Sequence, residues 1–396
     1  MKKQGFTLIE VLAVIVILSL LTLIIGKGVT KTVSYTKVKL SSIQEKLLLD
    51  AGEIWVSDNL NQIIDNSCTF VSIKELNDLG IIDSLEQFDD NIDIENYYVK
   101  ICSKENDSGE QKLDYSFYDA NEYAGCYAYT TSNNEVEITD YYDNIDNDFS
   151  NDVCPRDVAI PSKINGNSVT NIGEYAFNRS SLTSLTIPDS VTSIGEFAFY
   201  SSELTSLTIP DSVTSIGDSV FYSSQLESIT LGNSVTNIGE AAFYSSHLTS
   251  LVIPNSVTNI DDHAFFSSQL TSLTLGSSVT SIGNGAFYDS LLTSLTIPNN
   301  VTNIGDSAFH SSGLTSLILG NSITSIGWGA FKNSQLTSLE IPNSVTSIGD
   351  WAFENSQLTS VRISRNKDTN ILGVGTFGWA SGYSNDNICW NDYCPE

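Results

Sequence analysis

The most unusual chemical group in this sequence is the carboxylate of Glu10, which lies inside an apolar stretch. Residues 6–25 are apolar apart from Thr7, Glu10, Ser19 and Thr22, and a short segment with two lysines precedes them. At about 1.5 Å per residue, a helix of this length spans the roughly 30 Å of a bilayer core. Placing a carboxylate inside a membrane helix costs about 2.5–3.5 kcal/mol, so the group needs a compensating partner. The stretch therefore predicts a membrane helix whose charge is neutralised by another group.

The residues around Gly5 have the form of a processing signal. An ordinary secretory signal is cleaved at small residues after its apolar run, whereas GKGVTKTVS follows the run here. The stretch KKQG-FTLIEV resembles the type IV prepilin (class III) signal. The resemblance implies cleavage between Gly5 and Phe6 by a prepilin peptidase, and methylation of the new amino terminus. It also implies that Glu10 pairs with the amino terminus of a neighbouring subunit in a filament. A plain membrane anchor is the alternative.

An acidic segment has the spacing of a weak calcium site. Its oxygen-bearing side chains follow the first ligands of a calcium loop and its closing position: Asp146, Asp148, Ser150, Asp152 and Asp157. Asn151 stands where glycine is wanted, and the last ligand is not glutamate. A solvated acidic linker is the alternative. We expect no other metal site and no cofactor.

Six cysteines in a chain that we expect to be exported predict disulfides: Cys68, Cys102, Cys126, Cys154, Cys389 and Cys394. Six cysteines permit fifteen pairings, and sequence order suggests only that Cys389 and Cys394 close a small terminal loop. No histidine lies near any of them, which disfavours a zinc site.

The remaining polar residues do not predict catalysis or nucleic-acid binding. The three histidines occupy different repeat positions, and no serine or cysteine has a motif-defined base, so we expect no enzyme activity. The formal net charge is −29, and no Lys or Arg occurs between Lys112 and Arg156 or between Arg179 and Lys332. Because phosphate binding needs clustered cations, direct nucleic-acid binding by this part of the chain is disfavoured.

The elements that position these groups begin with a long helix. Beyond Gly26, apolar residues recur three or four apart, as one face of a helix that we expect to reach about Asn61: Val29, Val33, Leu40, Ile43, Leu47, Ala51 and Ile54. Residues 69–82 predict a strand or loop and a helical turn, and residues 97–102, 113–118 and 127–138 predict strands. This order resembles the small globular head of pilins and pseudopilins.

An internal repeat defines the rest of the chain. Phenylalanine recurs from Phe177 to Phe353 with an unbroken spacing of twenty-two residues, which gives nine units. Leu182, Leu185 and Ile187 have the L-x-x-L-x-L spacing of a leucine-rich repeat. The pattern I-P-x-S-V-T-x-I-G-x-x-A-F resembles the BspA-like, or Treponema pallidum type, leucine-rich repeat of bacterial surface proteins over residues 158–363. One unit cannot bury its own apolar side, so the units must stack.

Three rows of side chains recur along the expected solenoid. One row is a serine on the strand face of each unit, including Ser206, Ser228 and Ser250, and it either solubilises that face or binds protein or glycan. A second row is aromatic in five consecutive units: Tyr200, Tyr222, Tyr244, Phe266 and Tyr288. These rings either bind a ligand, by stacking on sugars or packing on a partner, or cover the coil below. The third row is acidic, and we expect it to begin a helical turn, where acids favour the positive helix end.

These observations predict an α+β chain: a pilin-type helix, a small α/β head and a leucine-rich-repeat solenoid of about nine 22-residue coils. The expected divisions are leader 1–5, helix and stalk 6–61, head 62–139, acidic linker 140–156, solenoid 157–377 and carboxyl-terminal cap 378–396.

The predicted function is that of a pilin-like subunit, minor or at the filament tip, which displays the repeats for adhesion or for binding protein or glycan. It would cross the membrane once before assembly and then lie on the cell surface or in an extracellular filament. Expected partners are other pilin-like subunits, the prepilin peptidase, the inner or cytoplasmic membrane before assembly, and a surface protein or glycan. The alternatives are a pseudopilin of a secretion or DNA-uptake system whose repeats bind exported cargo, and a structural surface protein without a ligand.

Overall fold

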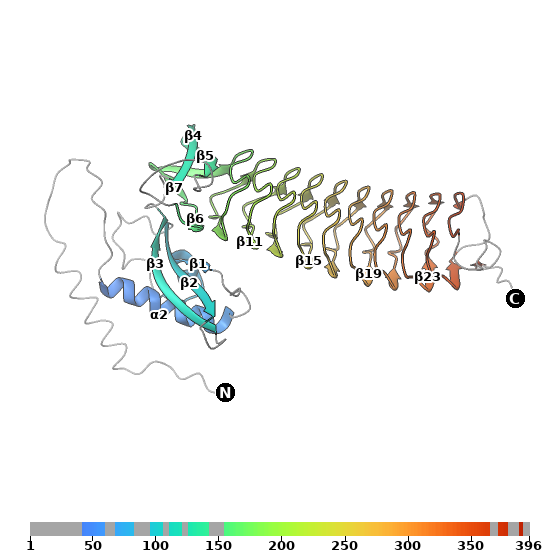
Figure 1. Ribbon diagram of the computed structural model, residues 1–396, viewed down its shortest axis with the longest axis horizontal. Helices are drawn as coiled ribbons and strands as arrows, with labels where there is room; N and C mark the ends of the chain where they lie inside the picture. Colours follow the sequence, from blue (N-terminus) through green and yellow to red (C-terminus); the bar gives the residue numbers. More distant parts are fainter. Residues whose placement is uncertain are drawn as a thin grey trace.

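The computed structural model of the protein describes residues 42–59, 68–82, 96–105, 111–120, 126–141, 154–364, 371–378 and 388–390. These residues form a β-solenoid of leucine-rich repeat type, with a small α/β head beside its amino-terminal end (Figure 1). Gly5, Phe6, Glu10 and the expected membrane segment lie outside the described residues. Neither helix of the described part is long and apolar enough to cross a bilayer.

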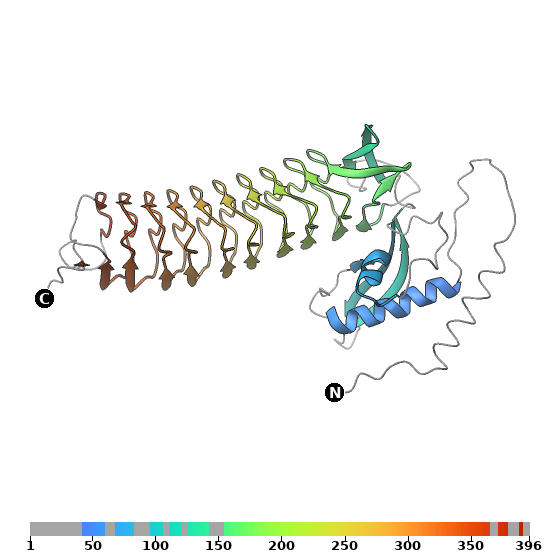
Figure 2. The same ribbon diagram turned by 180° about the vertical axis from the view of Figure 1, so that it is seen from behind.

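The head is a three-stranded antiparallel sheet covered on one face by a helix (Figure 2). Its elements are α2 (Ser42–Asn59), β1 (Cys68–Ser72), α3 (Ile73–Asp78), β2 (Tyr97–Glu105) and β3 (Gln111–Asp119), with the strand order β1-β2-β3. The side chain of Ser72 caps α3 by accepting a hydrogen bond from the backbone N–H of Glu75. The chain leaves this helix through Gly80, which has a φ of 68°.

Helix α2 packs on the sheet through a face different from the one expected. Leu48, Ala51 and Trp55 are buried against the sheet, whereas Leu47 and Ile54 are 44% and 48% exposed. The two faces are nearly equal in apolar character, so periodicity alone cannot rank them. The sheet selects the face that contains Gly52, where a Cβ atom would come within 2.7 Å of Val99 Cγ1.

Each coil of the solenoid contributes a strand of three or four residues, a strand of two residues and the turns between them. The longer strands lie along one edge of the rod in Figure 1: β9 (Ser184–Thr186), β11 (Ser206–Thr208), β13 (Ser228–Thr230), β15 (Ser250–Val252), β17 (Ser272–Thr274), β19 (Ser294–Thr296), β21 (Ser316–Ile318), β23 (Ser338–Ile341) and β25 (Ser360–Ile363). The shorter strands are β10 (Ser193–Ile194), β12 (Ser215–Ile216), β14 (Asn237–Ile238), β16 (Asn259–Ile260), β18 (Ser281–Ile282), β20 (Asn303–Ile304), β22 (Ser325–Ile326) and β24 (Ser347–Ile348).

The core of the solenoid is one column of apolar side chains that runs through every coil. The phenylalanines of the repeat are buried and stack ring on ring from Phe177 to Phe353, as the repeat predicts. Phe377, which follows after twenty-four residues, stacks on Phe353 at 5.5 Å. Between neighbouring coils the ring centroids lie 5.0 to 5.5 Å apart, so each ring is buried by the coils on either side.

The longer strands pair two by two, whereas the shorter strands from β12 to β24 form one continuous parallel sheet. The difference coincides with the identity of one residue shortly after the longer strand. It is proline in the coils of β9, β11, β15, β19 and β23, and glycine in those of β13, β17 and β21. Within the array from β9 to β25, a boundary is unpaired wherever the following coil carries the proline. Proline has no N–H with which a ladder could continue past it, and its position coincides with the unpaired boundaries.

The glycines of the alternate coils lie against the proline of the coil before. A Cβ atom on Gly232, Gly276 or Gly320 would come within 2.4, 2.1 or 2.2 Å of that proline's carbonyl oxygen. The array is therefore built from double coils, each made of a proline coil packed closely on a glycine coil.

Both ends of the Phe column are covered. At the amino-terminal end, β4 (Tyr127–Ser132) and β5 (Glu135–Tyr141) form a hairpin that joins β8 (Asn167–Ile172), while β6 (Asp157–Ala159) pairs with β9 and β7 (Lys163–Ile164) with β8. The rings of Tyr127 and Tyr141 lie 6.4 and 5.7 Å from that of Phe177. The hairpin, expected in the head, therefore caps the solenoid. At the other end, β26 (Cys389–Trp390) pairs with β25, and Trp390 is buried.

Candidate binding surfaces

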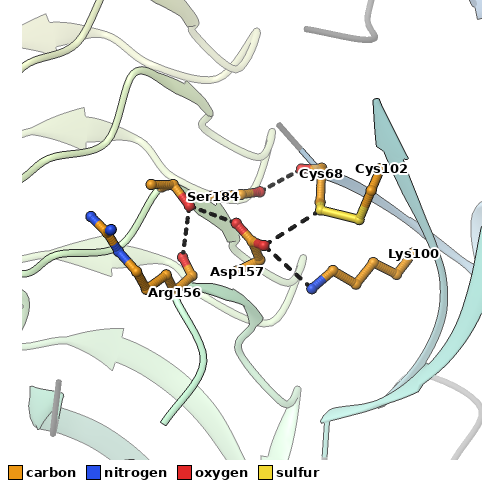
Figure 3. Close-up of a disulfide and its surroundings, with 7 residues drawn as sticks. Cys68, Lys100, Cys102, Arg156, Asp157 and Ser184 are labelled. Atoms are coloured by element: carbon orange, nitrogen blue, oxygen red, sulfur yellow. Dashed lines mark hydrogen bonds and ion pairs between the residues drawn. A yellow bond between two sulfur atoms is a disulfide. The ribbon is translucent and has the colours of Figure 1, made fainter. Parts of the chain in front are cut away.

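The head is joined to the first coils by a polar cluster beside a disulfide (Figure 3). Cys68 and Cys102 face each other across β1 and β2 and form that disulfide. The Asp157 carboxylate lies 3.5 Å from Lys100 Nζ and accepts a hydrogen bond of 2.6 Å from Thr183 Oγ1. Ser184 Oγ donates to the backbone carbonyl of Cys68 at 2.5 Å. Asp157, the expected closing calcium ligand, is thus held in an ion pair; the other four expected ligands lie outside the described residues.

A second set of contacts involves the sheet face opposite α2. Phe70, Tyr98 and Tyr118 form an aromatic cluster that contacts Ala159 of β6. Tyr118 Oη accepts a hydrogen bond from the backbone N–H of Ala159 at 3.2 Å. Asn96 Oδ1 accepts hydrogen bonds from the backbone and side chain of Ser162. The solenoid is therefore packed on the head through both apolar and polar contacts.

The serine row lies on the strand face, as the alternation predicts. Ser206 is half-buried, and Ser228 and Ser250 are exposed. The last two line a shallow groove of about 390 Å³ that crosses the unpaired boundary between β13 and β15. Val252 in this groove is 67% exposed. The structure thus brings two of the three named serines to one groove.

The aromatic row forms a stack in which each ring lies on its neighbours. Centroid distances run from 5.6 Å between Tyr200 and Tyr222 to 4.5 Å between Phe266 and Tyr288, with neighbouring planes at most 20° apart. His310 continues the stack at 4.6 Å from Tyr288. Because neighbouring rings cover the faces of the inner rings, these rings offer mainly their edges to a ligand.

His310 ends the aromatic stack in a partly desolvated place. Burial, followed by the positive charge of Lys332, lowers the pKa of His310, and Asp289 and Glu354 oppose the shift. Among the described residues, no group of three or more His, Cys, Asp or Glu side chains is arranged to hold a metal ion.

The acidic row joins successive coils rather than starting helical turns. Oδ1 of Asp218, Asp306 and Asp350 accepts a hydrogen bond from the backbone N–H of the equivalent residue in the next coil. The residue after the acid has a left-handed backbone in most coils, for example Ser219 with a φ of 54°, which is incompatible with a helical turn. The expected helix-end role was therefore wrong.

The cysteines form the disulfides that export predicts. Besides Cys68–Cys102, the bond Cys126–Cys154 ties the capping hairpin to the segment that enters the first coil. Cys389 is also disulfide-bonded, and no described cysteine is free. Cys394 lies outside the described residues.

Sequence reasoning missed two exposed tryptophans near the carboxyl-terminal end. Trp328 replaces the usual acid or amide of the third row, and Trp351 follows the acid of the next coil. Their centroids lie 5.6 Å apart, with ring planes at 81°. The available signal was the departure of both residues from the repeat pattern.

Comparison with protein families gives two matches. The BspA type leucine rich repeat region matches residues 149–271 and 258–378, and the prokaryotic N-terminal methylation motif matches residues 1–26. Both families are in general non-enzymatic. A comparison with curated proteins finds no match.

Several solved structures of bacterial repeat proteins are similar. A leucine-rich repeat protein from Bacteroides ovatus shares 27% identity over 67% of this chain and 69% of its own, with a TM-score of 0.54. The Treponema pallidum leucine-rich repeat protein shares 26% identity over 53% of this chain and 86% of its own, with a TM-score of 0.36. The first likeness agrees with the repeat fold described above.

Proposed function

We propose, from the premise that this chain belongs to the BspA-type leucine-rich repeat family, that it is a pilin-like surface subunit whose repeat array is a binding module. The observation that carries this proposal is the union, in one chain, of an amino-terminal methylation motif and a repeat array. The motif and the repeats together indicate a surface or pilin-like protein. Filament membership and ligand binding are the parts that we propose.

The exposed face of α2 supports filament membership. Leu47 and Ile54 are seven residues apart, which is about two helical turns, and both remain nearly half exposed. Exposed apolar residues at this spacing suit packing against another helix. In our proposal this face, together with Phe6 and Glu10, contacts neighbouring pilin-like subunits. The described head would then hold the solenoid to one side of the assembly.

The strand face and its groove support a binding module. Serine and threonine side chains cover the face, and the exposed Val252 and the partly buried Ile229 give the groove an apolar surface. A rigid array with capped ends can present such a surface without conformational cost on binding. Multiple copies along a filament would add avidity to a weak site.

The filament part is tested by the mature amino terminus and by the location of the array. We expect mass spectrometry to find a methylated Phe6 at the start of the mature chain, and antibodies against the solenoid to label sheared surface filaments. Glu10→Gln should be processed but remain in the membrane fraction, because it lacks the charge that pairs with the next subunit. A mature chain that begins at Met1, or one cut beyond Ile25, would contradict the proposal.

The two alternative functions are separated by capture with the full-length chain. Secreted proteins of the same cell would favour a pseudopilin that binds exported cargo. Retention of no protein or glycan would favour a structural surface protein. Binding to proteins or glycans of other cells supports adhesion.

A further inference from the structure

Trp328 and Trp351 stay exposed although the fold buries other tryptophans. Trp328 is 41% and Trp351 is 37% exposed, whereas Trp55 and Trp390 are each 2% exposed. The two exposed indoles meet at 81°, so they form a corner of two aromatic planes. Exposed indoles that contact each other in this way are costly to hydrate and are suited to contact a ligand.

The backbone at Trp351 shows that the repeat does not require an indole there. Trp351 has a φ of 55°, a left-handed conformation that is unfavourable for a bulky residue. The equivalent positions in the coils before and after are Gly329 and Gly375, with φ values of 57° and 59°. A Cβ atom on Gly375 would come within 2.7 Å of Trp351 Cδ1. The same position is left-handed in every coil from Tyr175 to Gly375, so this φ belongs to the repeat, and Gly375 leaves room for the indole of Trp351.

A charged pair lies beside the indole corner. Lys332 Nζ is 5.9 Å from the Trp328 ring centroid and 5.8 Å from that of Trp351. The same ammonium lies 2.5 Å from Glu354 Oε2. Lys332 is the only Lys or Arg between Arg179 and Arg362. The corner therefore combines two aromatic surfaces with an ion pair whose side chains are 24% (Lys332) and 14% (Glu354) exposed.

These features select among ligand classes. A cationic ligand is disfavoured because the Lys332 ammonium already lies over both rings. A polyanion is disfavoured by the net charge of −29 and by Asp306 and Asp350 in the same row as Trp328. A protein interface needs about 800 Å² per partner, whereas the two indoles that form this corner are each less than half exposed and offer a much smaller area. A sugar ring can place its C–H face on an indole and its hydroxyl groups near Lys332 and Glu354.

We infer that Trp328, Trp351, Lys332 and Glu354 form a binding site for a neutral saccharide near the carboxyl-terminal end of the solenoid. The inference rests on the proposed function only for its location, because display on a surface filament would carry the site away from the cell. Binding itself needs no filament. The site is separate from the serine groove, and it adjoins the end of the stacked aromatic row, because Lys332 and Glu354 occupy the next two positions after His310 in that row.

The test uses the purified full-length chain in detergent on an array of neutral and sialylated oligosaccharides. Trp351→Gly and Trp328→Asn are the matched variants, because other coils carry Gly329, Gly375 and Asn284 at these positions. Both variants should therefore fold. Tyr175→Ser is the control, since Tyr175 is an exposed aromatic residue at the position equivalent to Trp351, with a φ of 59°.

We expect neutral oligosaccharides to bind the wild-type chain and to lower the acrylamide quenching of its tryptophan emission. Each tryptophan variant should weaken binding by roughly tenfold or more, with an unchanged circular dichroism spectrum, and Tyr175→Ser should bind normally. The inference is overturned if no neutral oligosaccharide binds, if Trp351→Gly binds as wild type, or if only sialylated glycans or choline bind. Filaments that fail to form while glycan binding persists would count only against the proposed function.

Discussion

The double coil can be tested by adding a single methyl group at Gly276. The Cβ atom of Gly276→Ala would lie 2.1 Å from the carbonyl oxygen of Pro254, 2.7 Å from its carbonyl carbon and 3.0 Å from Asn255 Cα. Ordinary carbon–oxygen contacts are about 3.3 Å or longer, so one backbone must move by about 1.2 Å. Neither backbone is free to do so, since Ile253 N–H donates to Thr274 O at 2.8 Å in the same double coil.

The expected cost follows from these contacts. Overpacking costs about 1–3 kcal/mol, and loss of a ladder hydrogen bond adds about 1 kcal/mol. The lower entropy of the unfolded alanine chain offsets about 0.4–1 kcal/mol. Gly276→Ala should therefore destabilise the solenoid by about 1–3.6 kcal/mol. Gly232→Ala and Gly320→Ala should behave alike, because their distances to the preceding proline are similar.

Gly313→Ala is the matched control for this experiment. Its Cβ atom would have Leu292 O at 3.4 Å as its nearest neighbour, and its φ is not in the left-handed region. The same chemical change should leave stability unchanged or raise it by about 0.4–1 kcal/mol. Equilibrium urea unfolding of the full chain, followed by circular dichroism, compares the two. Equal midpoints for Gly276→Ala and Gly313→Ala would refute the close packing of proline and glycine coils.

Three further changes test other parts of the structure. Ser246 is fully buried and its Oγ has no hydrogen-bond partner, so Ser246→Ala should raise the stability of the fold by about 1 kcal/mol. The control Ser250→Ala removes an exposed hydroxyl and should change stability little. A large loss of stability for Ser246→Ala would show that its hydroxyl is hydrogen-bonded. Replacing Cys126 and Cys154 together by alanine should cost about 2–4 kcal/mol in thermal unfolding, because it releases the capping hairpin, and an unchanged melting temperature would contradict that role. The lowered pKa of His310 predicts stability that is present above the usual value of 6.5 and is lost as pH falls through the folded pKa. His310→Tyr should flatten that part of the pH profile, and an identical slope would contradict it.

The sequence predicts the solenoid well because each coil repeats the same local pattern. The spacing from Phe177 to Phe353 identifies the buried column, and the alternation around Leu185 identifies the strand that faces the core. Stacking then follows, since a single coil cannot bury its own apolar side. The helix at residues 73–78 and the strands of the head also follow from local pattern.

Features that depend on distant pairing could not be predicted in the same way. The hairpin of β4 and β5 reads as a generic pair of strands, and only its pairing with β8 places it on the solenoid. Leu47 and Leu48 belong to two different apolar faces of α2. Only contact with the sheet determines which face is buried. The left-handed turns at Ser219 and similar residues are occupied by non-glycine side chains, so the sequence gives no sign of them.

The candidate sites show a similar limit. An aromatic residue in five successive coils is compatible with either outward-facing or stacked rings. The structure shows that the rings stack. The indole corner was not predicted, because the repeat pattern is defined by its recurring residues and both tryptophans depart from it. Trp351 departs from the glycines at the equivalent position, and this departure was visible in the sequence.

The alternation of proline and glycine also has a mechanical consequence. A subunit tethered at one end and bound at the other would feel tension along the rod, and the boundaries at which only the shorter strands pair resist it least. The array should then unravel two coils at a time rather than one. From Pro254 to Pro298 such a step releases forty-four residues, or about 150 Å of extended chain. A tether of this kind would lengthen through several yielding steps.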